Sequence, residues 1–245
     1  MSAPAPRRPL ALVTGGSRGL GEVLARFLAA EGFDLLVTAR GEAALSRGAA
    51  ELRARGANVE EVPGDVADPV HRHELRRRVD RHGRLDLLVN NASELGPSPL
   101  PPLAEHPLPS LERVFQVNVL APLALVQELL PPLAAARGTV VNISSDAALG
   151  GYPGWGGYGA SKAALDLVSL TLAHELEDQG VAVVSVDPGD LRTTMHQAAY
   201  PGTDISDRPT PDVTLPFWAW LLHQDPRQLS GHRFRAQAER WEVPA

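Results

Sequence analysis

Residues 10–21 read LALVTGGSRGLG, and this stretch decides the fold. Leu10 to Thr14 is a short apolar run that ends in glycines, which is typical of a buried strand. From about Gly19 to Ala30 the apolar residues recur with helical spacing, and Gly32 follows, as a glycine often does just past a helix end. A strand that leads through a glycine-rich turn into a helix predicts the first unit of an α/β sheet.

Strands and helices alternate along the rest of the chain. We expect strands near residues 34–38, 58–62, 85–90, 139–143 and 181–186, and helices near 42–55, 70–82, 110–135, 158–179 and around Trp218. Pro122, Pro131 and Pro132 are expected to kink or end the long helix over 110–135. The alternation predicts a single α/β domain with a doubly wound, Rossmann-type parallel sheet of about seven strands and helices on both faces.

Composition excludes several classes of protein. The 245 residues carry a net charge of -6, whereas a nucleic-acid-binding protein needs a basic face. The chain has no cysteine, which rules out disulfides, thiolate metal sites and a cysteine nucleophile; we expect no metal. We read no signal peptide and no run that approaches a membrane span, and we expect a cytoplasmic protein.

The glycine turn has the chemistry of a phosphate site. Its spacing is Gly-x-x-x-Gly-x-Gly, at Gly15, Gly19 and Gly21, and it opens a helix whose N-terminus offers free N–H donors. A glycine-rich turn without a ligand is the alternative. We interpret residues 9–245 as one dinucleotide-binding and catalytic domain that follows a flexible leader, residues 1–8.

Two arginines predict which dinucleotide binds. Sheets that bind NAD carry an acidic residue about twenty positions past the glycines, where this chain has Ala39 and then Arg40. Arg18 lies inside the turn, and guanidinium groups suit a 2′-phosphate. The sequence favours NADP(H) over NAD(H), unless Arg40 is simply solvated at a strand end.

Tyr158 and Lys162 are four residues apart, which places both on one face of a helix. A phenol titrates near pH ~10, and a nearby ammonium lowers its pKa. The pair can therefore move protons to and from a carbonyl or an alcohol. By itself the pattern also occurs by chance on a solvated helix face.

Several motifs together resemble the short-chain dehydrogenase/reductase family. The glycine turn, Asn90-Asn91-Ala92, Asn118, Ser145, the Tyr158–Lys162 pair and Pro188-Gly189 stand in the family's order, over about residues 9–195. The resemblance implies that Tyr158 is the general acid-base, that Lys162 lowers its pKa and bonds the nicotinamide ribose, and that Ser145 orients the substrate oxygen. Asn118 resembles the asparagine that holds a water in the proton relay; a helix-bending polar residue is the alternative. We expect Ser144 to bond locally as a loop hydroxyl.

The resemblance also implies a set of cofactor contacts. Asp65 is similar to the carboxylate that meets the adenine amino group, or it is a turn-forming aspartate. The predicted cofactor-binding residues are Gly15, Ser17, Arg18, Gly19, Leu20, Gly21, Arg40, Asp65, Val66, Asn91, Ala92, Tyr158, Lys162, Pro188, Gly189, Leu191 and Thr193.

The sequence says less about the residues that contact the substrate. Ser93 stands where the family commonly has glycine, and it narrows the pocket or bonds the substrate. Tyr152, Trp155, Met195 and His196 either line a pocket for an apolar or aromatic substrate or serve packing and subunit contact. Residues of about 190–212 form the expected substrate loop, and glycine and proline around Thr203 to Pro211 indicate a mobile lid.

The leading hypothesis is an NADP(H)-dependent oxidoreductase that interconverts a ketone and a secondary alcohol. A homodimer or homotetramer is implied by resemblance only. Two alternatives remain: a lyase, isomerase or cyclase on the same scaffold, and a dinucleotide-binding regulator without turnover.

Overall fold

The computed structural model describes residues 8–243, so nearly all of the predicted leader (residues 1–7) lies outside the described residues. The strands are β1 (Leu10–Thr14), β2 (Asp34–Ala39), β3 (Val59–Pro63), β4 (Leu87–Asn90), β5 (Thr139–Ile143), β6 (Ala182–Asp187) and β7 (Arg233–Arg235). The α-helices are α1 (Gly19–Ala30), α2 (Glu42–Ala54), α3 (Pro69–His82), α4 (Leu108–Phe115), α5 (Ala121–Ala136), α6 (Ala147–Gly150), α7 (Gly156–Glu175), α8 (Thr194–Ala199), α9 (Leu215–Leu222) and α10 (Pro226–Leu229). Short turns η1 (Leu103–Glu105), η3 (Glu177–Gln179) and η4 (Pro211–Thr214) are 3-10 helical, and η2 (Gln116–Leu120) is π-helical.

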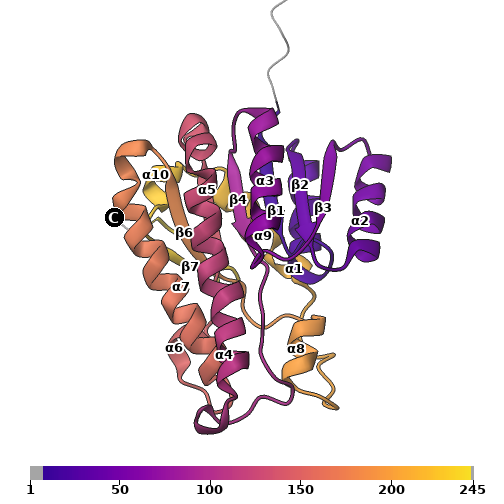
Figure 1. The fold of residues 1–245 in the computed structure, drawn as a ribbon, viewed down its shortest axis with the longest axis vertical. Helices are drawn as coiled ribbons and strands as arrows, with labels where there is room; N and C mark the ends of the chain where they lie inside the picture. Colours follow the sequence, from indigo (N-terminus) through magenta and orange to yellow (C-terminus); the bar gives the residue numbers. More distant parts are fainter. Residues whose placement is uncertain (1–7, 244–245) are drawn as a thin grey trace, which may run out of the picture.

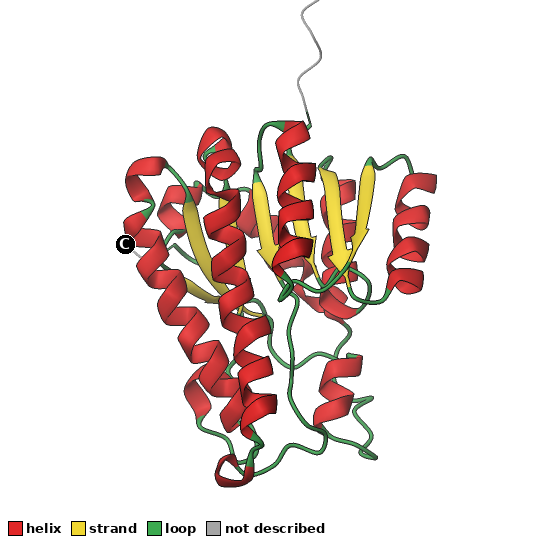
Figure 2. Cartoon of the chain, viewed as in Figure 1, coloured by secondary structure: helices red, strands yellow, loops and turns green. Residues whose placement is uncertain are grey.

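The strands form one parallel sheet in the order β3-β2-β1-β4-β5-β6-β7, which confirms the predicted doubly wound fold. The strand order reverses between β1 and β4, and ligands bind at such a reversal beyond the carboxyl ends of the strands. In Figure 2 the strand arrows point toward the end of the molecule where the long loops and α8 lie.

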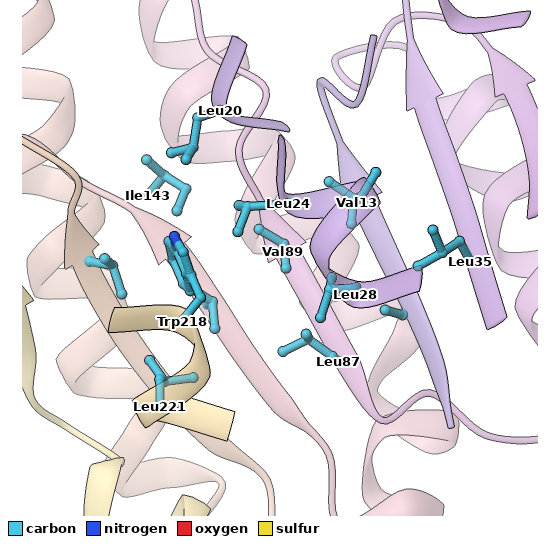
Figure 3. Close-up of a cluster of buried hydrophobic side chains, with 14 of the residues drawn as sticks. Val13, Leu20, Leu24, Leu28, Leu35, Leu87, Val89, Ile143, Trp218 and Leu221 are labelled. Carbon is cyan, nitrogen blue, oxygen red and sulfur yellow. The ribbon is translucent and has the colours of Figure 1, made fainter. Parts of the chain in front are cut away.

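The strands β1 to β6 each contribute side chains to two cores, because successive side chains point to opposite faces of a sheet. One core joins the sheet to α1, α2 and α9, and Figure 3 shows part of it, with Leu24 and Val89 drawn between Val13 and Trp218. The other core joins the opposite face to α3, α5 and α7, which lie in front of the sheet in Figure 1. Burial of each such side chain is worth about 1.5–3 kcal/mol, so both faces hold the strand ends in place.

The long helix differs from its prediction. It runs from Leu108 to Ala136 through the π-helical turn η2, and Pro131 and Pro132 lie inside α5 without ending it. Pro132 cannot donate to the Glu128 carbonyl one turn earlier, but Arg76 Nη1 donates to that carbonyl instead. None of the three prolines ends the helix, and its π-helical turn closes at Leu120, two residues before Pro122.

This helix also corrects the expectation that no run approaches a membrane span. By length and composition, Leu108–Ala136 is apolar enough to cross a membrane. Leu125, Leu129 and Leu133 are buried in the core shared with α3 and α7, as in the core helix of a folded domain. At the end of α7, η3 and then Gly180, with φ +72, close the helix near the predicted residue.

Candidate active site

One cleft of about 790 Å³ opens at the carboxyl ends of the strands. It is lined by all but two of the predicted site residues, and the exceptions, Gly21 and Asn118, lie behind its wall. We call the part lined by the glycine turn, Arg40, Asp65 and Arg113 the glycine-turn end. We call the part lined by Tyr152, Trp155, Tyr158, His196 and Tyr200 the aromatic end.

The glycine turn is shaped by close backbone approach. Gly15 has φ +67, and a Cβ on Gly21 would lie 2.3 Å from the Gly15 oxygen. Asn91 Nδ2 donates to the carbonyls of Thr14 (2.9 Å) and Gly15 (3.2 Å), while Thr14 Oγ1 accepts from the N–H groups of Asn91 and Ala92 at 3.0 Å. The Asn91 amide therefore holds the turn, and Thr14, which the sequence analysis did not single out, is its partner.

Three arginines line the glycine-turn end. Arg18 and Arg40 were predicted there, and Arg40 Nη1 lies 3.1 Å from Glu94 Oε2. Arg113 was missed, because it lies on α4, far from the glycine turn in sequence, and it pairs with Asp65. Burial acts to raise the pKa of Asp65, but hydrogen bonds from the Ala67 N–H and from Arg113 outweigh it and lower that pKa.

Tyr158 and Lys162 face the cleft from one side of α7, as their spacing predicts. The Lys162 side chain is fully buried, its Nζ donates to the Ile143 carbonyl at 2.8 Å, and it lies 5.5 Å from the centre of the Tyr158 ring. Burial lowers the pKa of Lys162 to about 8, although Asp166 acts in the opposite direction.

The expected lowering of the Tyr158 pKa is not what the structure shows. Burial raises the pKa of Tyr158 to about 12, Asp187 and Asp146 add to the rise, and the Ser93 hydroxyl counteracts it through hydrogen bonding. The physical reason is that the Lys162 ammonium is directed to a backbone carbonyl, while the phenol is removed from water.

The expectation that Ser144 bonds locally is wrong, and it is Ser145 that makes local hydrogen bonds. Ser145 Oγ donates to Asp146 Oδ1 at 3.1 Å and accepts from the Ala147 N–H at 3.2 Å. The Ser144 hydroxyl, expected to bond locally, is buried and has no hydrogen-bond partner among residues 8–243. Both serines line the cleft.

Asn118 lies in the π-helical turn η2, fully buried. Its Oδ1 accepts from Ser93 Oγ (3.1 Å) and the Glu94 N–H (2.7 Å), and its Nδ2 donates to the Glu94 carbonyl and Ser161 Oγ, both at 2.9 Å. The side chain thus joins the segment after β4 to α7. Single π-turns often mark functional sites, and the water-holding role stays a prediction.

Pro188, Gly189, Leu191 and Thr193 line the cleft beyond β6. The Gly189 N–H donates to Asp187 Oδ1 at 2.9 Å, and Gly189 has φ +73. Arg233 on β7, missed by sequence reasoning, binds three elements at once: Nη2 donates to the Ser145 carbonyl (2.8 Å) and to Asp187 Oδ2 (3.3 Å), and Nε donates to Asp166 Oδ2 (3.0 Å).

The aromatic end contains the predicted substrate residues Ser93, Tyr152, Trp155, Met195 and His196. The Trp155 ring lies 5.8 Å from that of Tyr158 and 6.1 Å from that of Tyr200, centre to centre. Tyr200 was missed because it sits in the irregular 190–212 segment, where no sequence pattern predicts its direction. Within that segment Thr193 caps the short helix α8 by accepting from the His196 N–H at 3.1 Å.

Comparison with known proteins agrees with this geometry. The family model described as short chain dehydrogenase matches residues 9–204. L-xylo-3-hexulose reductase of Hypocrea jecorina is 34% identical over 242 residues, which cover 91% of this chain and 79% of that protein.

Solved structures show the same fold. A short-chain dehydrogenase from Shigella flexneri, complexed with NADP, is 31% identical with a TM-score of 0.87, and the match covers 94% of this chain and 97% of that one. One from Escherichia coli, complexed with NADPH, has the same identity, score and coverage. Fold and site define a Rossmann-type oxidoreductase. The chain belongs to the short-chain dehydrogenase family, as its motifs indicate.

Proposed function

We propose that this protein is an NADP(H)-dependent oxidoreductase that interconverts a ketone and a secondary alcohol. The observation that carries the proposal is that Tyr158, Lys162 and Ser145 line the same cleft as the glycine turn. Lys162 is also the only lysine in the chain, among 23 basic residues. A buried ammonium is costly, so its presence here favours a functional role.

The glycine-turn end fits a dinucleotide phosphate. A Cβ at Gly15 would lie 2.8 Å from Asn91 Nδ2, and one at Gly21 would lie 2.3 Å from the Gly15 oxygen, so glycine is what permits the tight turn that such a phosphate site uses. Arg18 and Arg40 would hold a 2′-phosphate, and Asp65 would meet the adenine. When bound, the nicotinamide supplies or accepts the hydride.

Residues of the chain itself supply the proton and orient the substrate. In reduction, Tyr158 donates its phenolic proton to the carbonyl oxygen as that oxygen gains negative charge, and in oxidation it accepts the hydroxyl proton. Its raised pKa keeps the phenol protonated at neutral pH, which suits the donor role. Ser145 orients the substrate oxygen once its hydroxyl turns away from Asp146, and Lys162 bonds the nicotinamide ribose.

A substrate screen tests the reaction. We expect purified protein to consume NADPH in stoichiometric amounts with some members of a panel of ketones, and to form the matching alcohols. Turnover without net consumption of the cofactor would favour a lyase, isomerase or cyclase instead. Cofactor binding without turnover of any member would favour a regulator.

The cofactor preference has its own test. We expect a lower KM for NADPH than for NADH, and Arg40→Ala should reduce that preference about tenfold or more, because a charge-assisted hydrogen bond to the phosphate is lost. Arg47→Ala, an exposed arginine on α2 outside the cleft, is the control and should leave the preference unchanged. A wild-type preference for NADH would contradict the proposal.

We further propose that the protein works as a homodimer or homotetramer in the cytoplasm. Leu167 and Leu170 on α7 and Leu120 on η2 are large apolar side chains left exposed, which supports a subunit contact on this face. Light scattering of the purified protein tests the assembly, and a monomer would contradict it. Fractionation of cells tests the compartment.

A further inference from the structure

The two ends of the cleft carry opposite charge. Arginines line the glycine-turn end, namely Arg18, Arg40 and Arg113. At the aromatic end the described lining contains carboxylates, Asp146, Asp187 and Asp190, and its only lysine or arginine is Lys162. The buried Lys162 ammonium is already bound to the Ile143 carbonyl.

Of the three carboxylates at the aromatic end, Asp146 is the one whose charge is not neutralised by an ion pair among the described residues. It accepts from Ser145 Oγ at 3.1 Å, and no residue within 8–243 forms an ion pair with it. Its effect reaches two of the three phenols of this end, those of Tyr152 and Tyr158. It raises the pKa of Tyr152 through a hydrogen bond, and it adds to the rise that burial causes at Tyr158.

The neighbouring carboxylates are only partly neutralised. Arg233 pairs with Asp187 at 3.3 Å but also with Asp166 at 3.0 Å. In the same way Arg208 lies 3.5 Å from Asp190 and is shared with Asp207. Each guanidinium therefore serves two carboxylates, and negative charge remains in excess around the aromatic end.

Two polar groups at this end are buried without a partner among the described residues. They are the Ser144 hydroxyl, on a residue 1% exposed, and Nε2 of His196, whose side chain is 10% exposed; both residues line the cleft. A buried polar atom without a partner is costly, so such atoms indicate a ligand that completes them. The rings of Trp155, Tyr158 and Tyr200 provide flat apolar walls beside them.

We propose that the aromatic end selects its substrate by charge: it binds a carbonyl compound or alcohol with a neutral or positively charged aromatic body and rejects an anionic one. This inference rests on the proposed function and deepens it, because it names the class of substrate. Rejection comes from the carboxylate excess, and attraction of a cation comes from the same charge together with the faces of the aromatic rings.

Three matched ketones test the proposal: acetophenones with a trimethylammonium, an amide or a carboxylate group in the para position. Their Kd values are measured by calorimetry on enzyme loaded with NADP⁺, and their reduction is measured with NADPH. We expect the carboxylate to bind about tenfold or more weakly than the amide, the size of one charge repulsion across a partly solvated cleft. The cation should bind at least as tightly as the amide.

Asp146→Asn tests the source of the selection. The amide oxygen of Asn can still accept from Ser145 Oγ, so the change removes charge with little change of shape. We expect the ratio of carboxylate to amide Kd to fall several-fold, while Asp178→Asn, at an exposed aspartate in η3, leaves it unchanged.

The outcomes separate the two proposals. Equal or tighter binding of the carboxylate, an Asp146→Asn ratio equal to the wild type's, or no binding of any probe at millimolar concentration would overturn the charge selection. Binding in the expected order without NADPH-dependent reduction of any ketone in a wide panel would overturn the proposed function alone.

Discussion

The glycine-turn end and the aromatic end of the cleft are built in different ways. At the glycine-turn end the contacts that shape the site are backbone contacts, such as the approach of Gly21 to the Gly15 carbonyl, and its side-chain charge is positive. At the aromatic end the shape comes from side chains on two loops, among them Trp155 and Tyr200, and the charge is negative. Main-chain contacts persist when most side chains are substituted, so the glycine-turn end suits a ligand that stays the same. The aromatic end is formed by side chains, so substitutions there can change which substrate binds.

The largest expected effect is at the junction of the two ends. Tyr158→Phe removes the proton donor and keeps the ring against Trp155, so kcat should fall by about 10³-fold, within the range of general acid-base catalysis. The Kd for NADPH should stay within about threefold, a change of about 0.7 kcal/mol or less. Tyr200→Phe, which also keeps its ring beside Trp155, is the control and should retain most activity. Full activity of Tyr158→Phe would refute the proposed mechanism.

The second effect concerns the glycine-turn end alone. In Gly21→Ala the new Cβ would lie 2.3 Å from the Gly15 oxygen and 2.5 Å from Asn91 Nδ2, so the turn must move. We expect NADPH affinity to fall by more than about tenfold, measured by fluorescence titration. Gly48→Ala, where nothing lies within 4 Å, is the matched control. If circular dichroism shows a folded variant with wild-type affinity, the close backbone approach is not what forms the site.

The third prediction separates function from stability at Lys162. Burial lowers its pKa from 10.5 to about 8. Below pH 8 both the folded and the unfolded chain hold the proton, so folding bears the full cost of the buried charge. Between pH 8 and 10.5 the folded chain loses the proton first, and this cost declines as the pH rises.

Lys162→Met is therefore expected to raise the free energy of unfolding at pH 7 by about 3 kcal/mol while lowering activity. The gain should shrink toward pH 10.5, as measured by urea denaturation of cofactor-free protein at several pH values. Because Lys162 is the only lysine, its titration can also be followed singly by NMR on protein labelled with ¹³C-lysine. A gain that grows with pH would contradict the lowered pKa.

The smallest effect is expected for substitution of Arg233, which donates to the Ser145 carbonyl next to the aromatic end. Arg233→Met removes the bond to the Ser145 carbonyl and leaves Asp187 and Asp166 without their shared cation. We expect kcat to fall about tenfold, the equivalent of 1.4 kcal/mol, with a smaller change in the KM for NADPH. Arg233→Lys should recover part of the loss, since it restores the charge without the fork. If the KM for NADPH instead rises by the same factor as kcat falls, Arg233 has a general structural role.

Much of the site could be predicted from the sequence because its signals are local. The Tyr158–Lys162 spacing fixes both residues on one helix face, and the turn after β1 must approach its own backbone, which only glycine permits. Other parts could not be predicted. No local sequence pattern distinguishes the Ser144 hydroxyl, which has no partner among residues 8–243, from that of Ser145, because the difference depends on which atoms surround each one.

The sequence by itself determined the parallel α/β sheet, the glycine turn and the acid-base pair, since strand burial, helix periodicity and glycine geometry act over a few residues. It took the tertiary structure to show that the pKa of Tyr158 is raised and that α5 continues through Pro131 and Pro132. It likewise decided the link from Arg233 to the Ser145 carbonyl and the opposite charge of the two ends. The physical reason is common to all of these: each depends on burial and on partners that are distant in the chain, and folding alone brings them together.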